Sequence, residues 1–80
     1  MAKWYDLMDF ESNNMVGSYE SEDGALRDVL DALTRHGSVA VATLALLWGN
    51  EAGEGELIAE GEGLAKLAIS RLARAKRRSA

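Results

Sequence analysis

Apolar and polar residues alternate in the first part of the chain, which predicts two strands joined by a tight turn. Residues 4–10 (WYDLMDF) mix β-forming side chains with acids, and residues 15–19 (MVGSY) predict the return strand. The turn between them contains two asparagines, which tolerate the positive φ angles of a tight hairpin. Gly17 indicates a weakened strand, a bulge or a close backbone approach. One face of the first strand carries Trp4, Asp6, Met8 and Phe10, and the other carries Tyr5, Leu7 and Asp9.

The apolar positions after residue 21 follow the period of an amphipathic helix. Ser21 is a favourable N-cap residue, the two acids after it suit the first turn, and Gly37 is placed to end the helix. The polar face carries oppositely charged residues four positions apart, which stabilise a helix weakly. The apolar positions are Leu26, Val29, Leu30 and Leu33.

A continuous apolar run, residues 39–48 (VAVATLALLW), follows this helix. The absence of polar alternation predicts a strand that is buried on both faces or central in its sheet. A short buried helix is the alternative, because alanine and leucine favour helix, whereas Gly37 and Gly49 on either side favour the strand. Residues 49–55 form the connection to a short strand at residues 56–59, expected to be antiparallel to the run.

The last segment predicts a second helix from about residue 62 to residue 77. The complete order is ββαββα, so the expected fold class is α+β: one small domain over residues 1–80, with a four-stranded, mostly antiparallel sheet and two helices packed on one face. Residues 76–80 are expected to be a frayed basic tail. The apolar face of this helix carries Leu64, Ala65, Ala68, Ile69, Leu72 and Ala75.

Charge is segregated along the chain. Residues 1–63 carry three cations against all 13 acids, for a net charge of −10, and residues 64–80 carry six cations and no acid, which together give the total of −4. Acids at the start and cations at the end of the last helix complement its dipole. Alternatively, the basic end contacts phosphates or an acidic protein surface, including the body of the same protein. The candidate contact residues are Lys66, Arg71, Arg74, Lys76, Arg77 and Arg78.

Composition removes several classes of chemistry. The absence of cysteine excludes disulfides, thiolate zinc sites and cysteine nucleophiles, and fits a reducing compartment. The single histidine, His36, excludes a two-histidine metal site within one chain, and its position predicts a helix C-terminal residue. Neither phosphate-binding glycine motif is present, and no apolar run reaches the length of a membrane span. We therefore expect no enzyme activity, no cofactor, no metal and a cytoplasmic location.

The acidic, glycine-rich segment at residues 46–64 (LLWGNEAGEGELIAEGEGL) is the stretch most suggestive of a site. An EF-hand frame starting at Asn50 has glycine at its sixth position, but Ala52 and Gly61 occupy its third and twelfth, so the calcium pattern fails. We interpret the segment as the end of a strand, an acidic turn and a helix start.

Two other groups invite a chemical interpretation. Asp6, Asp9 and Glu11 are too few for a metal site and are more typical of an edge strand that its charges protect from aggregation. The aromatic residues are expected to pack in the core or at an interface rather than to stack nucleic-acid bases, with Trp48 in the core. These residues are Trp4, Tyr5, Tyr19 and Trp48.

The motifs SYESEDGALRDVLDAL and LALLWGNEAGEGELIAEGEGLAKLA resemble small uncharacterised bacterial proteins of actinobacterial type with a ββαββα layout. The resemblance covers roughly residues 4–69 and implies no activity. A weaker similarity, through VGSYESEDGAL, is to HicB-type antitoxins, in which a hairpin leads into a helix opened by serine or threonine and acids. Here DFESNN replaces the Pro-Gly-Cys stretch of that family, and its C-terminal DNA-binding module is absent.

These observations predict a small non-enzymatic interaction or regulatory protein that acts through self-association and protein–protein contacts, with a homodimer favoured. Three alternatives remain open. One is a nucleic-acid-associated regulator that uses the basic end of the chain, and another is an antitoxin-like protein that binds a basic partner with its acidic body. The third is a carboxylate enzyme or metal binder, in which the acidic glycine-rich loop at residues 49–56 binds a cation. No membrane association is expected.

Overall fold

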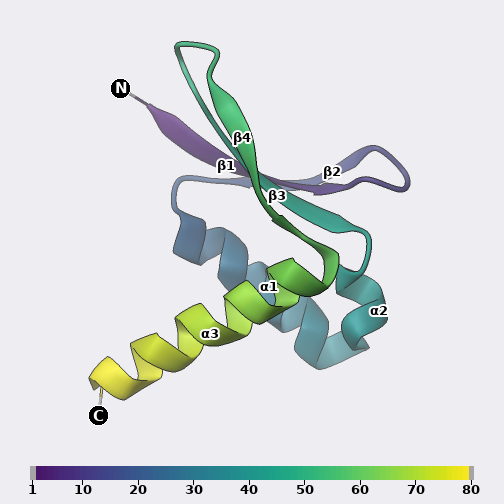
Figure 1. Ribbon diagram of the computed structural model, residues 1–80, viewed down its shortest axis with the longest axis vertical. Helices are drawn as coiled ribbons and strands as arrows, with labels where there is room; N and C mark the ends of the chain where they lie inside the picture. Colours follow the sequence, from purple (N-terminus) through teal and green to yellow (C-terminus); the bar gives the residue numbers. More distant parts are fainter. Residues whose placement is uncertain (1, 80) are drawn as a thin grey trace.

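The computed structural model describes the backbone of residues 2–79 and the side chains of residues 2–73, and confirms an α+β fold. Four antiparallel strands form one sheet in the order β2-β1-β3-β4. All three helices lie on the same side of this sheet (Figure 1). The elements are β1 (Lys3–Asp9), β2 (Asn14–Tyr19), α1 (Glu22–His36), α2 (Ser38–Val41), β3 (Leu44–Asn50), β4 (Gly55–Glu60) and α3 (Gly61–Ser79).

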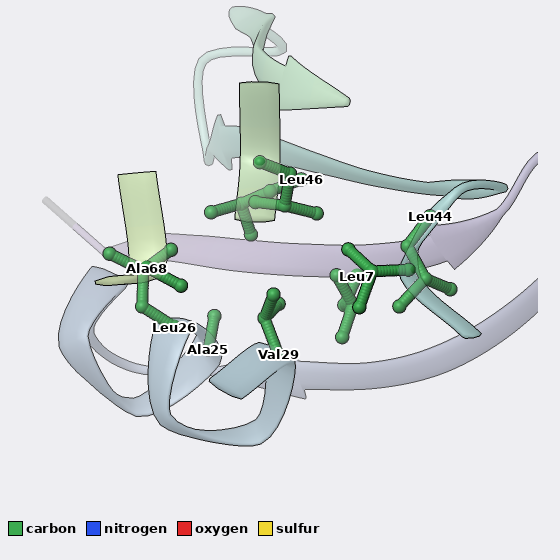
Figure 2. Packing of buried hydrophobic residues seen from close by; sticks show 9 residues of the cluster. Leu7, Ala25, Leu26, Val29, Leu44, Leu46 and Ala68 are labelled. Carbon is green, nitrogen blue, oxygen red and sulfur yellow. The ribbon is translucent and has the colours of Figure 1, made fainter. Parts of the chain in front are cut away.

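The core lies between the sheet and the helices. Leu7 of β1 and Leu46 of β3 are paired in register and are almost completely buried. They pack toward Ala25 and Val29 of α1 (Figure 2). Burial of side chains of this size contributes about 1.5–3 kcal/mol each, which makes this small cluster the main source of stability. The other members of the cluster are Leu26, Val41, Leu44, Leu64 and Ala68.

The ends of α1 follow the sequence prediction. The Ser21 side chain accepts a hydrogen bond from the backbone N–H of Gly24 at 3.1 Å, which satisfies one of the open donors of the first turn. Gly37 has a φ of 82° and donates its N–H to the carbonyl of Leu33. A positive φ favours glycine, so this residue ends the helix as expected.

The expectation of one strand over residues 39–48 is wrong in its first part. Residues 38–41 form the short helix α2, and β3 begins only at Leu44. The chain must reverse between α1 and β3, and a helical turn accomplishes this while it buries Val41 against the core. Alanine and valine alone do not distinguish this turn from a strand. The central position that we expected for the strand is confirmed, because β3 lies between β1 and β4.

The expectation that the first strand is an edge strand is also wrong. β1 is central, and the edges are β2 and β4. Each edge strand contains a bulge: the register shifts at Val16 in β2 and at Ile58 in β4. Leu7 of β1 is buried in the core, and the next side chain along the strand, Asp6, points to the opposite side of the sheet.

Helix α3 begins at Gly61, one residue before the predicted start, and extends to Ser79. Gly61 has a φ of 54°, and a Cβ atom there would lie 3.2 Å from the carbonyl oxygen of Ala42, so the tight junction with β4 requires glycine. The fraying expected for residues 76–80 stays a prediction, because residue 80 and all side chains from residue 74 onward lie outside the described part of the chain. Over the described part of the chain, no helix is long and apolar enough to cross a membrane.

Candidate functional site

The sheet surface that faces away from the helices is the strongest candidate for a functional site, and we call it the open face. Leu7 points toward the helices, so its neighbours Asp6 and Met8 point away from them, and residues paired in register share a face. This surface is uncovered, because all three helices lie on the other side (Figure 1). The register places on it Trp4, Asp6, Met8, Met15, Ser18, Ala45, Leu47, Gly49, Gly55, Leu57 and Glu60.

Large apolar side chains on the open face are accessible to solvent. The exposed fraction is 36% for Trp4, 55% for Met15 and 49% for Leu57, and these residues come from three different strands. Monomeric proteins rarely expose a contiguous apolar surface without a function for it. A solvated sheet face normally carries polar residues, so these exposed apolar side chains make the open face a candidate contact surface.

Trp4 is held in position by its neighbour across the strand pair. Its indole ring lies over Gly49, where an added Cβ atom would come within 3.0 Å of the indole nitrogen. A glycine at this position leaves the space that the ring occupies. The ring is thus fixed against the sheet with part of its surface exposed, which is the arrangement of a rigid aromatic anchor.

Asp6 lies at the centre of this apolar surface. It is paired in register with Ser18 on one side and with Leu47 on the other, and Trp4 and Met8 flank it on the same face of β1. The Ser18 hydroxyl donates a hydrogen bond of 2.8 Å to an Asp6 carboxylate oxygen. The carboxylate is half-buried, and its described neighbours on the open face include no cation.

The side of the sheet that faces the helices carries a second aromatic group. The ammonium of Lys3 lies 4.7 Å from the centre of the Trp48 ring and 5.5 Å from that of the Tyr5 ring. Trp48 is half-buried rather than part of the core, so the expectation of a core position is wrong. Trp48 lies in the second half of β3, which leads into the hairpin that extends away from the helices (Figure 1). Its ring is therefore covered by Lys3 and not by a helix. A cation–π contact at an exposed site contributes about 0.5–1 kcal/mol.

Two of the basic candidate residues pair with carboxylates of the same chain. Arg71 contacts Glu22 at 2.6 Å and Asp23 at 3.1 Å, which links α3 to the start of α1. The hydrogen bonds that Arg71 donates to Asp23 and Glu22 raise the pKa of its guanidinium further above its usual value. Lys66 pairs with Glu62 one turn earlier on α3, at 3.4 Å.

The other four basic candidates have side chains outside the described residues. They are Arg74, Lys76, Arg77 and Arg78, all within the helical backbone of α3. A contact of this basic end with phosphates or with an acidic partner therefore stays a prediction. For Arg71, the structure shows a contact with acidic residues of the same protein, which is one of the interpretations of the charge pattern given above.

The acidic glycine loop is a hairpin turn. The Asn50 side-chain oxygen accepts hydrogen bonds from the backbone N–H groups of Ala52 and Glu54, and its amide donates to the Glu54 carboxylate. Gly53, with a φ of 82°, completes the turn. Among the described residues, no three acidic or histidine side chains are grouped so as to hold a metal ion.

Two remaining candidates also occupy structural positions. Asp9 caps the β1–β2 turn, because its carboxylate accepts hydrogen bonds from the backbone N–H groups of Glu11 and Ser12. His36 is the last residue of α1 and is exposed, as its sequence position predicted. Neither residue lies on the open face.

A shallow groove of about 400 Å³ lies between α2 and the start of α3. Val39, Val41 and Ala65 contribute apolar lining, and Glu62 contributes a carboxylate at the rim. This groove has the volume of a small ligand pocket but is open to solvent, whereas ligand pockets usually enclose most of the ligand. It carries no convergent polar groups comparable to those of an active site.

Alternation along the first strand grouped Trp4, Asp6 and Met8 on one face correctly. Alternation did not reveal that Met15 and Leu57 continue this surface, because strand order and both bulges depend on tertiary pairing. Comparison of the chain with protein-family models, with curated proteins and with solved structures finds no match. The resemblances to small bacterial proteins and to HicB-type antitoxins therefore stay predictions.

Proposed function

We propose that this protein is a small interaction protein that acts through self-association, with the open face of its sheet as the contact surface. The observation that carries the proposal is the group of exposed apolar side chains on this face, Trp4, Met15 and Leu57. Water contact with such a surface is unfavourable, and a partner that covers it stabilises the complex by about 25 cal/mol for each Å² of apolar area. We also propose that the protein is cytoplasmic, because a chain without cysteine suits a reducing compartment.

The edges of the sheet are less suitable for self-association. Pairing of strands between two copies needs a straight edge with regularly spaced N–H and C=O groups. Both edge strands are interrupted by bulges, at Val16 and Ile58, and β4 also carries Glu56 and Glu60. These features oppose edge-to-edge pairing, so packing of one open face on another is the arrangement that we propose.

A second copy of the chain offers an open face of the same size. Four strands at about 4.8 Å spacing and about 20 Å in length give a flat area of roughly 400 Å² per copy. Two such areas give roughly 800 Å² in total, which is below the size of standard specific interfaces and in the range of weak, transient contacts. The dimer that we propose, with two sheets packed face to face, is therefore a weak one.

Replacement of Leu57 with aspartate tests this proposal. A new charge on the open face must lose water when the interface forms, so Leu57→Asp should weaken the dimer by about 100-fold or more. Ile69→Asp is a matched control: Ile69 is an exposed aliphatic residue on α3, with 51% of its surface accessible against 49% for Leu57. Sedimentation equilibrium over a range of concentrations measures both dissociation constants.

The expected result is a dimer for the unchanged protein and for Ile69→Asp, and a monomer for Leu57→Asp under the same conditions. Circular dichroism and urea unfolding verify that both variants fold. Equal dissociation constants for the two variants, or a monomeric unchanged protein at high concentration, would contradict the proposal.

A further inference from the structure

Two aromatic rings on neighbouring strands contact one ammonium group on the side of the sheet that faces the helices. Tyr5 of β1 and Trp48 of β3 are paired in register and share this side with Lys3. The Lys3 ammonium lies 4.7 Å from the centre of the Trp48 ring and 5.5 Å from that of the Tyr5 ring, and both distances suit a cation–π attraction. Among the described residues, Lys3 forms no ion pair. This charge is therefore placed by the two rings, which we call the aromatic pair, and not by a carboxylate.

The aromatic pair is accessible to a ligand from solution. Both rings are half-buried, and Trp48 lies outside the core cluster, on the half of β3 that leads into the hairpin extending away from the helices (Figure 1). Glu56 of β4 is paired in register with Trp48, so its exposed side chain flanks that ring on the side opposite Tyr5. Two ring faces and a carboxylate attract a cation and repel an anion once the Lys3 ammonium moves away.

We propose that the aromatic pair and Glu56 bind a trimethylammonium group, and that Lys3 occupies the pair when this ligand is absent. A trimethylammonium group has the charge of a lysine ammonium but no N–H groups, so it loses less hydration against a ring face, and its methyl groups bury apolar surface there. Lys3 is exposed and has a flexible stem, so its ammonium is free to leave the rings. The site is independent of the open face, because Tyr5 and Trp4 point to opposite sides of the sheet.

Titration with choline, followed by amide and indole NMR signals, tests the site. The indole N–H signal of Trp48 should shift with a dissociation constant in the millimolar range, while that of Trp4, on the other side of the sheet, should stay unchanged. The neutral isostere of choline, in which carbon replaces the charged nitrogen, measures apolar contact alone and should bind about tenfold more weakly. Equal binding of choline and its isostere would contradict the proposal.

Replacement of Lys3 tests whether its ammonium competes with the ligand. Lys3→Met keeps an apolar side chain of similar length, and choline should bind it about fivefold more tightly because the rings are no longer occupied. Lys66→Met is the matched control: it removes the same charge from an exposed lysine that pairs with Glu62 on α3. An equal gain in affinity for both variants, or no gain for Lys3→Met, would mean that Lys3 does not occupy a ligand site.

Two further substitutions remove parts of the site itself. Trp48→Leu should abolish the choline-dependent shift of the Tyr5 amide signal, with circular dichroism to verify the fold. Glu56→Gln changes an exposed position and should weaken choline binding by about twofold or more at low salt, whereas Glu51→Gln, in the β3–β4 turn, should have a smaller effect. Choline shifts that persist in folded Trp48→Leu, or equal affinities for the two glutamine variants, would overturn the assignment.

A second probe distinguishes two sources of the trimethylammonium group. Choline represents a small molecule, and trimethylated lysine with blocked ends represents a modified side chain of a protein partner. The probe that binds more tightly identifies the source, and the absence of a Trp48 shift with both probes rejects the site. Leu57→Asp changes the open face alone and should leave choline binding unaltered, so this result and the test of self-association are separate.

Discussion

At the scale of single residues, side chains far apart in the sequence determine how each face of the sheet is used. Tyr19 of β2 lies over Gly17, where an added Cβ atom would approach the phenol oxygen to 2.6 Å, and its hydroxyl donates a hydrogen bond to Asp28 of α1. The sequence indicated that Gly17 marks a weakened strand, a bulge or a close approach: the close approach is at Gly17, and the bulge is at the preceding residue, Val16. The partner of Tyr19 was not predictable, because it depends on how α1 packs on the sheet.

The Tyr19–Asp28 contact predicts a loss of stability at high pH. Burial, the hydrogen bond to Asp28 and its negative charge raise the pKa of Tyr19 from 10.0 to about 12. The folded protein therefore keeps the phenol proton at pH values where the unfolded chain loses it. The stabilisation is complete below the unfolded pKa of 10.0 and disappears as pH rises toward 12.

Urea unfolding across this range, for the unchanged protein and for Tyr19→Phe, measures the effect. The free energy of unfolding of the unchanged protein should fall more steeply with pH than that of Tyr19→Phe, which lacks the titrating group. Absorbance of tyrosinate in the folded state should show a late phase that Tyr19→Phe lacks. Parallel pH profiles for the two proteins would mean that the Asp28 contact does not stabilise the phenol.

At the scale of elements, local signals predicted segments well and their arrangement less well. The period of Leu26, Val29, Leu30 and Leu33 predicted α1, and Ser21 and Gly37 predicted both of its ends. The apolar run at residues 39–48 was misinterpreted in part, because a helical turn and a buried strand carry the same kind of residues there. The central position of β1 depends on pairing with β3, over a distance in sequence that local patterns do not encode.

The contact of Arg71 with Glu22 and Asp23 predicts how α3 is attached to α1. Arg71→Ala should lower the free energy of unfolding by about 1 kcal/mol, because it removes hydrogen bonds to two carboxylates at a partly exposed site. Lys66→Ala is the matched control, since Lys66 pairs with Glu62 on the surface of one helix and should cost only about 0.3–0.5 kcal/mol.

Urea unfolding at low salt gives both values, and added salt should reduce the difference between Arg71→Ala and the unchanged protein because it screens exposed ion pairs. An effect of Arg71→Ala no larger than that of Lys66→Ala would show that the α1–α3 contact adds no stability beyond a surface pair. In that case the basic end of α3 would be better explained by an external partner.

At the scale of the whole molecule, the described residues 2–79 form one layer of helices on one sheet, and these helices leave the second face of that sheet uncovered (Figure 1). A chain of this size buries a limited fraction of its surface, and the described core consists of nine residues. Association through the open face would add apolar burial without adding residues. The acids that we expected to protect an edge strand include Asp6, which instead lies at the centre of this face on the central strand β1.

The composition led us to expect an interaction protein, which stays a prediction, and it did not predict the open face. Trp4, Met15 and Leu57 come from three strands, and their proximity arises only when the sheet forms with its bulges in place. The charge pattern predicted contacts for the basic end of the chain but did not predict their partners. In the folded protein, Arg71 pairs with Glu22 and Asp23 of α1.

Two-dimensional amide NMR spectra across a dilution series test most directly whether the open face is the surface through which two copies associate. We predict that dilution shifts the amide signals of residues on the open face of β1, β3 and β4, such as Asp6, Leu47 and Leu57, with one common dissociation constant. Signals around Ile69 of α3 should stay unchanged. Shifts confined to the helices, or spectra that do not depend on concentration, would contradict the account.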